Sequence, residues 1–225
     1  MSGATPGVQS RPDGFELLRQ AMVDDLRDKH HITDERVLAA MLTLPRHLFV
    51  PEALRSQAYK NGALPIAGGQ TISQPFIVAR MTELLELKGT EKILEIGAGT
   101  GYQTAILASL ARKVFSIERL RNLVIEASKR LDLLGFTNVN MKGADGTAGW
   151  EAYQPYDAIL VAAGGPSVPQ PLIAQLSIGG RLIIPVGEDH NKQELVRVTK
   201  TATGTTKENF GPCAFVPLIG EYGWN

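Results

Sequence analysis

The segment ILEIGAGTGYQTA, residues 93–105, passes from a short apolar run through a glycine-rich turn into a helix-forming stretch. Gly97, Gly99 and Gly101 space the turn as Gly-x-Gly-x-Gly. Glycine adopts positive φ and lets the backbone approach a ligand, and the helix that follows offers free amide groups at its first turn. The segment therefore predicts a strand, a ligand-binding turn and a helix within an α/β sheet.

The same alternation of short strands and helices continues on the C-terminal side. It is the βαβ pattern of a parallel sheet covered on both faces. Two later runs, QELVRVTKT (193–201) and CAFVPLIG (213–220), are predicted to be strands with no helix between them, so we expect them to pair antiparallel or not at all. The other strands are expected at 92–96, 113–118, 138–142, 156–163 and 180–187, with helices at 75–87, 102–112, 120–135 and 169–176.

The N-terminal third has a different character. Residues 1–13 are rich in Ser, Gly and Pro, which predicts a disordered tail. Residues 14–75 are expected to form two helices and an irregular substrate-side region, with Thr33 as the N-cap of the second helix. With 76–225 as the cofactor-binding core, residues 14–225 are expected to form a single domain.

Composition narrows the function. Lys plus Arg and Asp plus Glu both number 23, so the zero formal charge gives no footprint for a nucleic-acid partner. The single cysteine, Cys213, permits no internal disulfide and fits a reducing compartment, where we expect it to be a small buried apolar residue. Four scattered histidines predict no metal site. Without a signal peptide or an apolar run of about 20 residues, we expect a soluble, cytoplasmic protein.

Three carboxylates stand near the predicted carboxyl ends of successive strands. Glu95 precedes Gly97 by two positions, where an anion would repel a pyrophosphate but suit the cationic methionine portion of S-adenosylmethionine. Glu118 ends the second strand, where a carboxylate accepts hydrogen bonds from ribose hydroxyls. Asp145 and Gly146 follow the third strand and are expected to meet the adenine amino group.

Each carboxylate also has a structural interpretation. Glu95 could be an edge charge, Glu118 a solvated strand end, and Asp145 a turn former before Gly146. Their joint occurrence where an open α/β sheet binds ligands favours the cofactor-binding interpretation.

With these motifs, residues 75–225 resemble the class I S-adenosylmethionine-dependent methyltransferases. The resemblance implies a Rossmann-like, seven-stranded sheet that is mostly parallel, with an antiparallel C-terminal strand. A narrower resemblance, to the protein-L-isoaspartate O-methyltransferases, covers nearly the whole chain from about residue 15. It rests on PRHLFVPE (45–52), the TISQP segment within 58–85, GGRLIIPVG (179–187) and FVPLIGEYGW (215–224).

That family's active-site serine corresponds to Ser73, with Gln74 and Ile72 implied as substrate-binding neighbours. The family's Gly-Asp-Gly reads Ala144-Asp145-Gly146 here, which keeps the carboxylate. The implied reaction methylates the carboxylate of L-isoaspartyl, and possibly D-aspartyl, residues in damaged proteins and releases S-adenosylhomocysteine. A carboxylate is already ionised at neutral pH, so Ser73 is expected to position it by a hydrogen bond.

Alternatives stay open at this point. Ser73 could be the N-cap of the helix that begins near Pro75. The chain could instead methylate a different small molecule or RNA, or be a binding module that keeps the fold without the activity. The sequence gives no oligomeric state.

Overall fold

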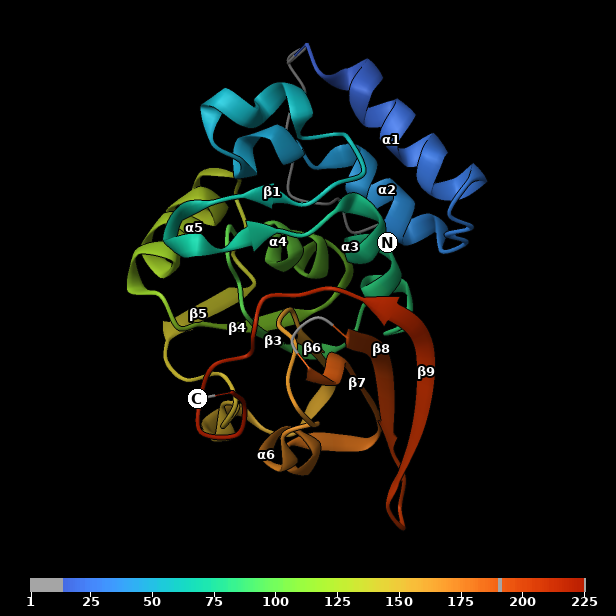
Figure 1. Ribbon diagram of the computed structural model, residues 1–225, viewed down its shortest axis with the longest axis vertical. Coiled ribbons are helices and arrows are strands. Elements are labelled where there is room, and N and C mark those ends of the chain that lie inside the picture. Colours follow the sequence, from blue (N-terminus) through green and yellow to red (C-terminus); the bar gives the residue numbers. More distant parts are fainter. Residues whose placement is uncertain (1–13, 190–191, 225) are drawn as a thin grey trace.

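The computed structural model describes residues 14–189 and 192–224. Residues 1–13, the predicted tail, and His190 lie outside the described residues. A twisted sheet forms the centre, with helices on both faces (Figure 1). Within the described ranges the sheet has seven strands in the order β5-β4-β3-β6-β7-β8-β9. The strands are β3 Lys92–Ile96, β4 Lys113–Glu118, β5 Val139–Gly143, β6 Tyr156–Val161, β7 Leu176–Asp189, β8 Lys192–Lys200 and β9 Thr205–Cys213.

Strand direction follows the predicted pattern. The strands from β5 through to β7 are parallel, β8 pairs antiparallel with β7, and β9 pairs antiparallel with β8. The Rossmann-like, mostly parallel sheet with an antiparallel strand in its C-terminal part is therefore confirmed: that strand is β8, and β9 follows it at the edge. Strand order reverses between β3 and β6, and this switch point is where open α/β sheets bind ligands.

The helices divide between the two faces of the sheet. The N-terminal helices α1 and α2 pack with α3 and α4 on one side, and α6 lies on the other (Figure 1). A small ribbon, β1 Leu64–Pro65 with β2 Thr71–Ile72, links this helical layer to the site. The helices are α1 Glu16–Asp28, α2 Glu35–Thr43, α3 Pro75–Glu83, α4 Tyr102–Leu110, α5 Arg121–Leu133 and α6 Gln170–Ala174, with 3-10 turns η1 Arg46–Phe49, η2 Glu52–Gln57, η3 Ala67–Gly69 and η4 Glu151–Tyr153.

Alternation along the strands builds a core on each face. In β3, Ile93 packs with the helical layer that holds the N-terminal helices, whereas Leu94 and Ile96 pack with the opposite cluster. Both faces are apolar because both are covered, as expected for a parallel sheet.

Helix α2 begins one residue later than predicted. Asp34 is its N-cap, and its carboxylate accepts from the backbone N–H groups of Arg36 and Val37. Thr33 is not the cap, because its amide and hydroxyl both donate to Glu83 Oε1, at 2.7 and 3.0 Å. A contact between distant elements has replaced the local one.

The prediction of a strand over 213–220 is wrong. The edge strand is β9, whose polar sequence carries little apolar alternation, and only Cys213 of the predicted run belongs to it. The residues that follow cross the carboxyl edge of the sheet instead. The amide of Gly164 donates to Val216 O and the amide of Leu218 donates to Gly164 O, both at 2.8 Å. Pro217 between them has no amide to donate to a ladder.

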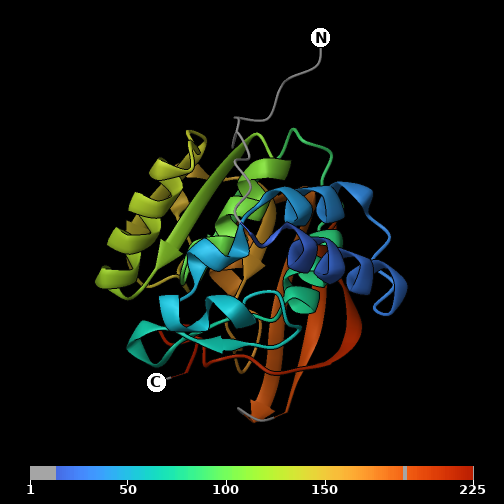
Figure 2. The same ribbon diagram turned by 90° about the horizontal axis from the view of Figure 1, so that it is seen from above.

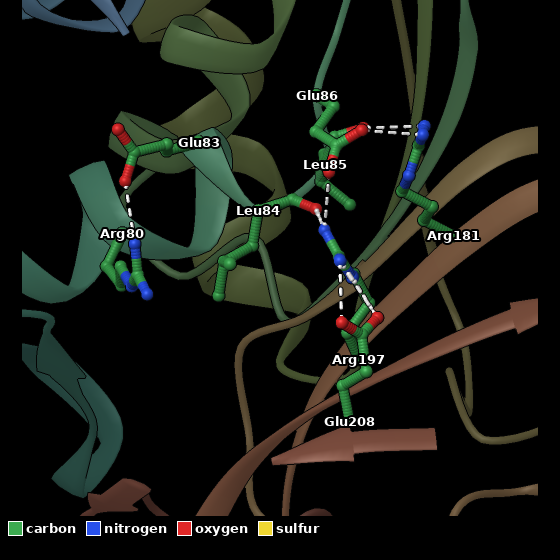
Figure 3. A network of polar contacts seen from close by, with 8 residues as sticks. All are labelled: Arg80, Glu83, Leu84, Leu85, Glu86, Arg181, Arg197 and Glu208. Carbon is green, nitrogen blue, oxygen red and sulfur yellow. Dashed lines mark hydrogen bonds and ion pairs between the residues drawn. The ribbon is translucent and has the colours of Figure 1, made fainter. Parts of the chain in front are cut away.

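A polar network ties the C-terminal end of α3 to the antiparallel part of the sheet (Figure 3). Glu86 pairs with Arg181 and Arg197, each at 2.7 Å, and Arg197 also pairs with Glu208 on β9. Arg197 donates to the carbonyl of Leu84, one of the groups that a helix end leaves without a partner. The network fixes α3 relative to β7, β8 and β9.

Among the described residues, no helix is both long and apolar enough to cross a membrane. The same part of the chain contains no group of three or more His, Cys, Asp or Glu side chains that could hold a metal ion.

Candidate functional site

The glycine-rich turn after β3 takes the conformation that its sequence predicts. Gly97, Gly99 and Gly101 all have positive φ, of 88°, 55° and 85°. A Cβ on Gly101 would lie 3.2 Å from the Cβ of Ala127, so glycine there also permits α4 to lie against α5. The turn holds its backbone open toward a cavity at the carboxyl edge of the sheet.

This first cavity, which we call the nucleoside cavity, has an empty volume of about 800 Å³ including its mouth. It lies at the switch point, between the ends of β3, β4 and β6. Its glycine side is polar, and its walls include apolar side chains of Ile96, Ile117 and Leu120. The other lining residues are Gln70, Thr71, Gly97, Gly99, Glu118, Arg119, Gly146, Ala162, Ala163 and 216–219.

Glu118 presents a buried carboxylate at the nucleoside cavity. Its Oε2 accepts from the amide of Gly99 at 2.9 Å, and its Oε1 accepts from the amide of Leu120 at 2.8 Å. Each carboxylate oxygen has two lone pairs, so both oxygens keep the capacity to accept a ligand hydroxyl. The two backbone bonds fix the carboxylate in place before a ligand arrives.

Glu95 lies behind the turn rather than among the residues that line the nucleoside cavity. Its side chain is fully buried, and Oε2 accepts from the hydroxyls of Thr104 and Ser116 at 2.5 and 2.6 Å. Oε1 is buried with no hydrogen-bond partner in the described structure. Burial raises the pKa of Glu95 to about 7, although the two hydroxyl groups oppose this shift. Among the described residues, Oε1 is therefore an unsatisfied buried acceptor close behind the glycine turn.

Asp145 and Gly146 have separate positions. Gly146 lines the nucleoside cavity, and a Cβ there would lie 2.3 Å from Ile96 Cγ2, so glycine is required for this packing. Asp145 is not among the lining residues. Its Oδ1 accepts from Thr147, and its Oδ2 accepts from the amide of Glu221 at 2.8 Å. Its carboxylate thus ties the C-terminal stretch to the end of β5.

Ser73 lies beside a second cavity, which we call the acceptor cavity. Its walls include Ser73, Gln74, Phe76 and Ile77 around the start of α3, and residues 212–216 at and after the end of β9. A narrower space, lined by Ile72, Ser73 and residues 97–100 among others, joins Ser73 to the glycine turn. The structure thus brings Ile72 and Ser73 to the glycine turn, although the sequence separates them from it, whereas Gln74 lines only the acceptor cavity.

Ser73 is not the cap of α3. The N-cap is Gln74, with no side-chain cap bond, and the amide of Phe76 donates to Asn61 Oδ1 at 3.0 Å. The structural alternative for Ser73 is therefore not realised.

Several lining residues had no distinguishing signal in the sequence. Thr71 and Ala162 line both named cavities and the narrow space between them, so they mark where the cavities meet. Residues 216–219 wall the nucleoside cavity, and Figure 2 shows this C-terminal stretch (red) on the same side of the molecule as the β1–β2 ribbon (teal). Because their apolar sequence is typical of a strand, the sequence contained no indication that they line a cavity.

Cys213 is half-buried and lines the acceptor cavity, so it is less buried than predicted. Burial raises the pKa of its thiol to about 11, which keeps the thiol protonated at neutral pH.

Together these features suit two ligands that meet near Ser73. A carboxylate beside apolar walls fits a ribose with an attached base, and the buried oxygen of Glu95 fits a cationic group near the glycine turn. The acceptor cavity lies beside the Ser73 hydroxyl, which fits a polar group of a second ligand.

The comparisons agree with this geometry. The family model described as protein-L-isoaspartate(D-aspartate) O-methyltransferase matches residues 17–223. A protein-L-isoaspartate O-methyltransferase of Syntrophus aciditrophicus (strain SB) is 55% identical over 216 residues, which cover 95% of this chain and 99% of that protein.

Solved structures are similar over the same extent. One, a protein-L-isoaspartate O-methyltransferase, has a TM-score of 0.81 at 28% identity and covers 91% of this chain and 67% of its own. Another, a putative protein-L-isoaspartate O-methyltransferase from Plasmodium falciparum in complex with S-adenosyl-L-homocysteine, has a TM-score of 0.76 at 26% identity, covering 92% of this chain and 99% of its own. The chain belongs to the protein-L-isoaspartate(D-aspartate) O-methyltransferase family.

Proposed function

We propose that this protein transfers a methyl group from S-adenosylmethionine to the free carboxylate of L-isoaspartyl residues in damaged proteins, as the first step of their repair. The observation that carries the proposal is the meeting of the nucleoside and acceptor cavities at Thr71 and Ala162, with Ser73 beside the junction. Family membership supplies the substrate class.

The nucleoside cavity suits the cofactor. Glu118 would accept the ribose hydroxyls while the amides of Gly99 and Leu120 hold its carboxylate still. Ile96, Ile117 and Leu120 supply apolar surface for the adenine. Gly146 leaves room at the wall of the cavity, and Asp145 acts indirectly through the C-terminal stretch that it holds.

Glu95 would act from beneath the turn. Its unpartnered oxygen offers an acceptor for the ammonium of the methionine portion, and an arriving cation would favour the ionised carboxylate. S-adenosylmethionine supplies its methyl group on a sulfonium, a donor that needs no activation by the protein.

The acceptor carboxylate needs alignment rather than deprotonation. Its ordinary pKa is near 4, so no general base is required at neutral pH. Ser73 would donate a hydrogen bond to one of its oxygens and Gln74 would contribute its amide, which leaves the other oxygen directed at the methyl carbon. Orientation of this kind lowers a barrier without a change of protonation.

Damaged proteins and peptides are the partners that this proposal requires. The balanced charge of the chain supports a protein substrate over a nucleic acid, and we place the enzyme in the cytoplasm, where its single cysteine stays reduced.

The decisive experiment measures transfer of radiolabelled methyl to two peptides that differ only in an isoaspartyl or an aspartyl residue. We expect base-labile label on the isoaspartyl peptide alone. Equal labelling of both peptides would reject the substrate. No labelling of either, with S-adenosylhomocysteine bound in calorimetry, would reject the activity while leaving cofactor binding intact.

A further inference from the structure

Arg46 lies behind Ser73 and is fully buried. It begins the 3-10 turn η1 and reaches two segments of the chain. Its Nε donates to the carbonyl of Ala58 at 2.8 Å, and its Nη2 donates to the carbonyl of Ser73 at 2.6 Å. The guanidinium therefore holds the main chain of the proposed active-site residue from the side opposite the solvent.

The positive charge of Arg46 is not balanced by a protein anion. Both of its hydrogen-bond acceptors are neutral carbonyls, and no carboxylate of the described residues lies within ion-pair distance. The guanidinium carbon lies 4.6 Å from the ring centroid of Tyr102, and the Tyr102 hydroxyl also interacts with the guanidinium. Burial raises the pKa of this phenol to about 12, so Tyr102 is neutral at physiological pH and supplies no balancing charge. Nη1 is buried and has no hydrogen-bond partner in the described structure.

Such an arrangement is costly. Moving a cation out of water without a paired anion carries a large desolvation penalty, and buried charges in proteins are ordinarily paired. Burial lowers the pKa of Arg46, but a guanidinium keeps its proton at any physiological pH. A buried cation without a paired anion attracts an anion that binds nearby more strongly than an exposed or paired cation would.

The acceptor carboxylate of the proposed reaction is an anion that could pair with this charge. Ser73 lines the acceptor cavity and the narrow space leading to the glycine turn, so an acceptor carboxylate on its hydroxyl would be separated from the guanidinium by a single residue. At an effective dielectric constant of about 20, opposite unit charges on the order of 10 Å apart attract strongly enough to change a dissociation constant by about tenfold.

We propose that Arg46 is a positioning residue with two tasks: it fixes Ser73 through its carbonyl, and its charge makes the acceptor cavity select an anionic acceptor over a neutral one. This inference rests on the proposed carboxylate acceptor. It assigns to Arg46 a part of the substrate preference that Ser73 alone would not supply, because a hydroxyl can also hydrogen-bond a neutral amide.

The test compares Arg46→Lys with Arg46→Gln. Neither side chain can span both carbonyls, and only the lysine keeps the charge. Calorimetry with S-adenosylhomocysteine present measures binding of an isoaspartyl peptide and of the same peptide with that carboxylate converted to an amide. We expect the wild type to prefer the carboxylate at least tenfold, Arg46→Lys to keep most of this ratio, and Arg46→Gln to lose about tenfold of it.

Measurements of turnover test the first task, the support of Ser73, separately from the preference for an anionic acceptor. Both variants should have a lower kcat on the isoaspartyl peptide, because Ser73 loses part of its support, while the dissociation constant of S-adenosylhomocysteine stays within about twofold of the wild type. Equal weakening of both peptides in Arg46→Gln would overturn the electrostatic role, as would a wild type that binds both peptides equally.

If Arg46→Gln does not fold, the carboxylate preference and the kcat of Arg46→Lys test the inference by themselves. Loss of its preference for the carboxylate would contradict the inference, and a kept preference with lower kcat would support it. Failure of the wild type to methylate the isoaspartyl peptide at all would instead reject the proposed function, so the two failures are distinguishable.

Discussion

Ser73 divides its work between its main chain and its side chain. Its carbonyl accepts from Arg46, and the start of α3 is capped by Asn61, which accepts from the amide of Phe76. The hydroxyl is thereby spared a structural role, although serine is a favoured capping residue. A substitution that removes only this hydroxyl should separate activity from stability.

We therefore expect Ser73→Ala to lower kcat/KM for the isoaspartyl peptide by roughly 10- to 100-fold, the effect of losing one hydrogen bond to a charged group. Affinity for S-adenosylhomocysteine and the melting temperature should stay near wild-type values. Asn61→Ala is the matched control, since it should lower the melting temperature through loss of the cap. A large loss of cofactor affinity in Ser73→Ala would contradict the assignment.

For Glu118 we expect a substitution to change the affinity for the cofactor, in contrast to Ser73→Ala. Glu118→Gln keeps the size of the side chain but removes its charge and half of its acceptor capacity, so the ribose hydroxyls lose charge-assisted bonds. We expect the dissociation constant of S-adenosylhomocysteine to rise about tenfold or more, by calorimetry. An unchanged constant would refute the ribose role. The melting temperature without cofactor reports any separate loss at the Gly99 and Leu120 amides.

At the scale of elements, α3 is the part whose placement matters most. Its first turn carries Phe76 and Ile77 into the acceptor cavity, and its last turn is held by the network around Arg197 (Figure 3). Arg197 is 14% exposed and contacts Glu86, Glu208 and the carbonyl of Leu84. A largely buried, multiply bonded arginine contributes more than an exposed pair.

Replacing Arg197 should therefore loosen α3 on the sheet. We expect Arg197→Met to lower the free energy of unfolding by about 1–3 kcal/mol in urea denaturation, because Leu84 O, Glu86 and Glu208 lose a shared partner. Arg27→Met is the control: Arg27 also pairs with a glutamate, Glu35, but at an exposed site, so the loss should be clearly smaller. Equal losses would show that the network adds nothing beyond surface pairing.

For the whole molecule, Glu95 makes stability depend on pH. Burial raises its pKa from the ordinary 4.5 to about 7 in the folded protein. Between these values the folded state binds more protons at this site than the unfolded chain does. Its stabilising contribution is therefore fully present below pH 4.5 and is lost as the pH rises through 7, a change on the order of 3 kcal/mol.

Comparison with Glu95→Gln isolates this contribution from other titrating groups. We expect the difference in unfolding free energy, wild type minus variant, to fall between about pH 4.5 and pH 7 and to be level above that range. Chemical denaturation of both proteins at closely spaced pH values without cofactor would measure it. A level difference throughout would show that Glu95 titrates normally in the folded state.

The sequence by itself determined the parallel strands, β8 and most of the helices, but not the edge strand β9. Strands β3, β4 and β6 are mostly apolar and are separated by helix-forming segments, so the sequence pattern that predicts them is local. The turn was likewise predicted by the spacing of Gly97, Gly99 and Gly101, because glycine is the residue that readily adopts positive φ. The position of Glu118 in the nucleoside cavity follows from the end of β4, and that of Gly146 from the turn after β5.

Only the tertiary structure decided which distant groups meet. Thr33 hydrogen-bonds Glu83, fifty residues away, while Asp34 caps α2 in its place. Residues 214–219 lie outside the sheet strands, and Val216 and Leu218 hydrogen-bond Gly164. The carboxylate of Asp145 accepts hydrogen bonds from Thr147 and Glu221. Arg46 donates to the carbonyl of Ser73, which lies 27 positions later in the chain. Such contacts depend on how elements pack, and no local pattern of residue types records them.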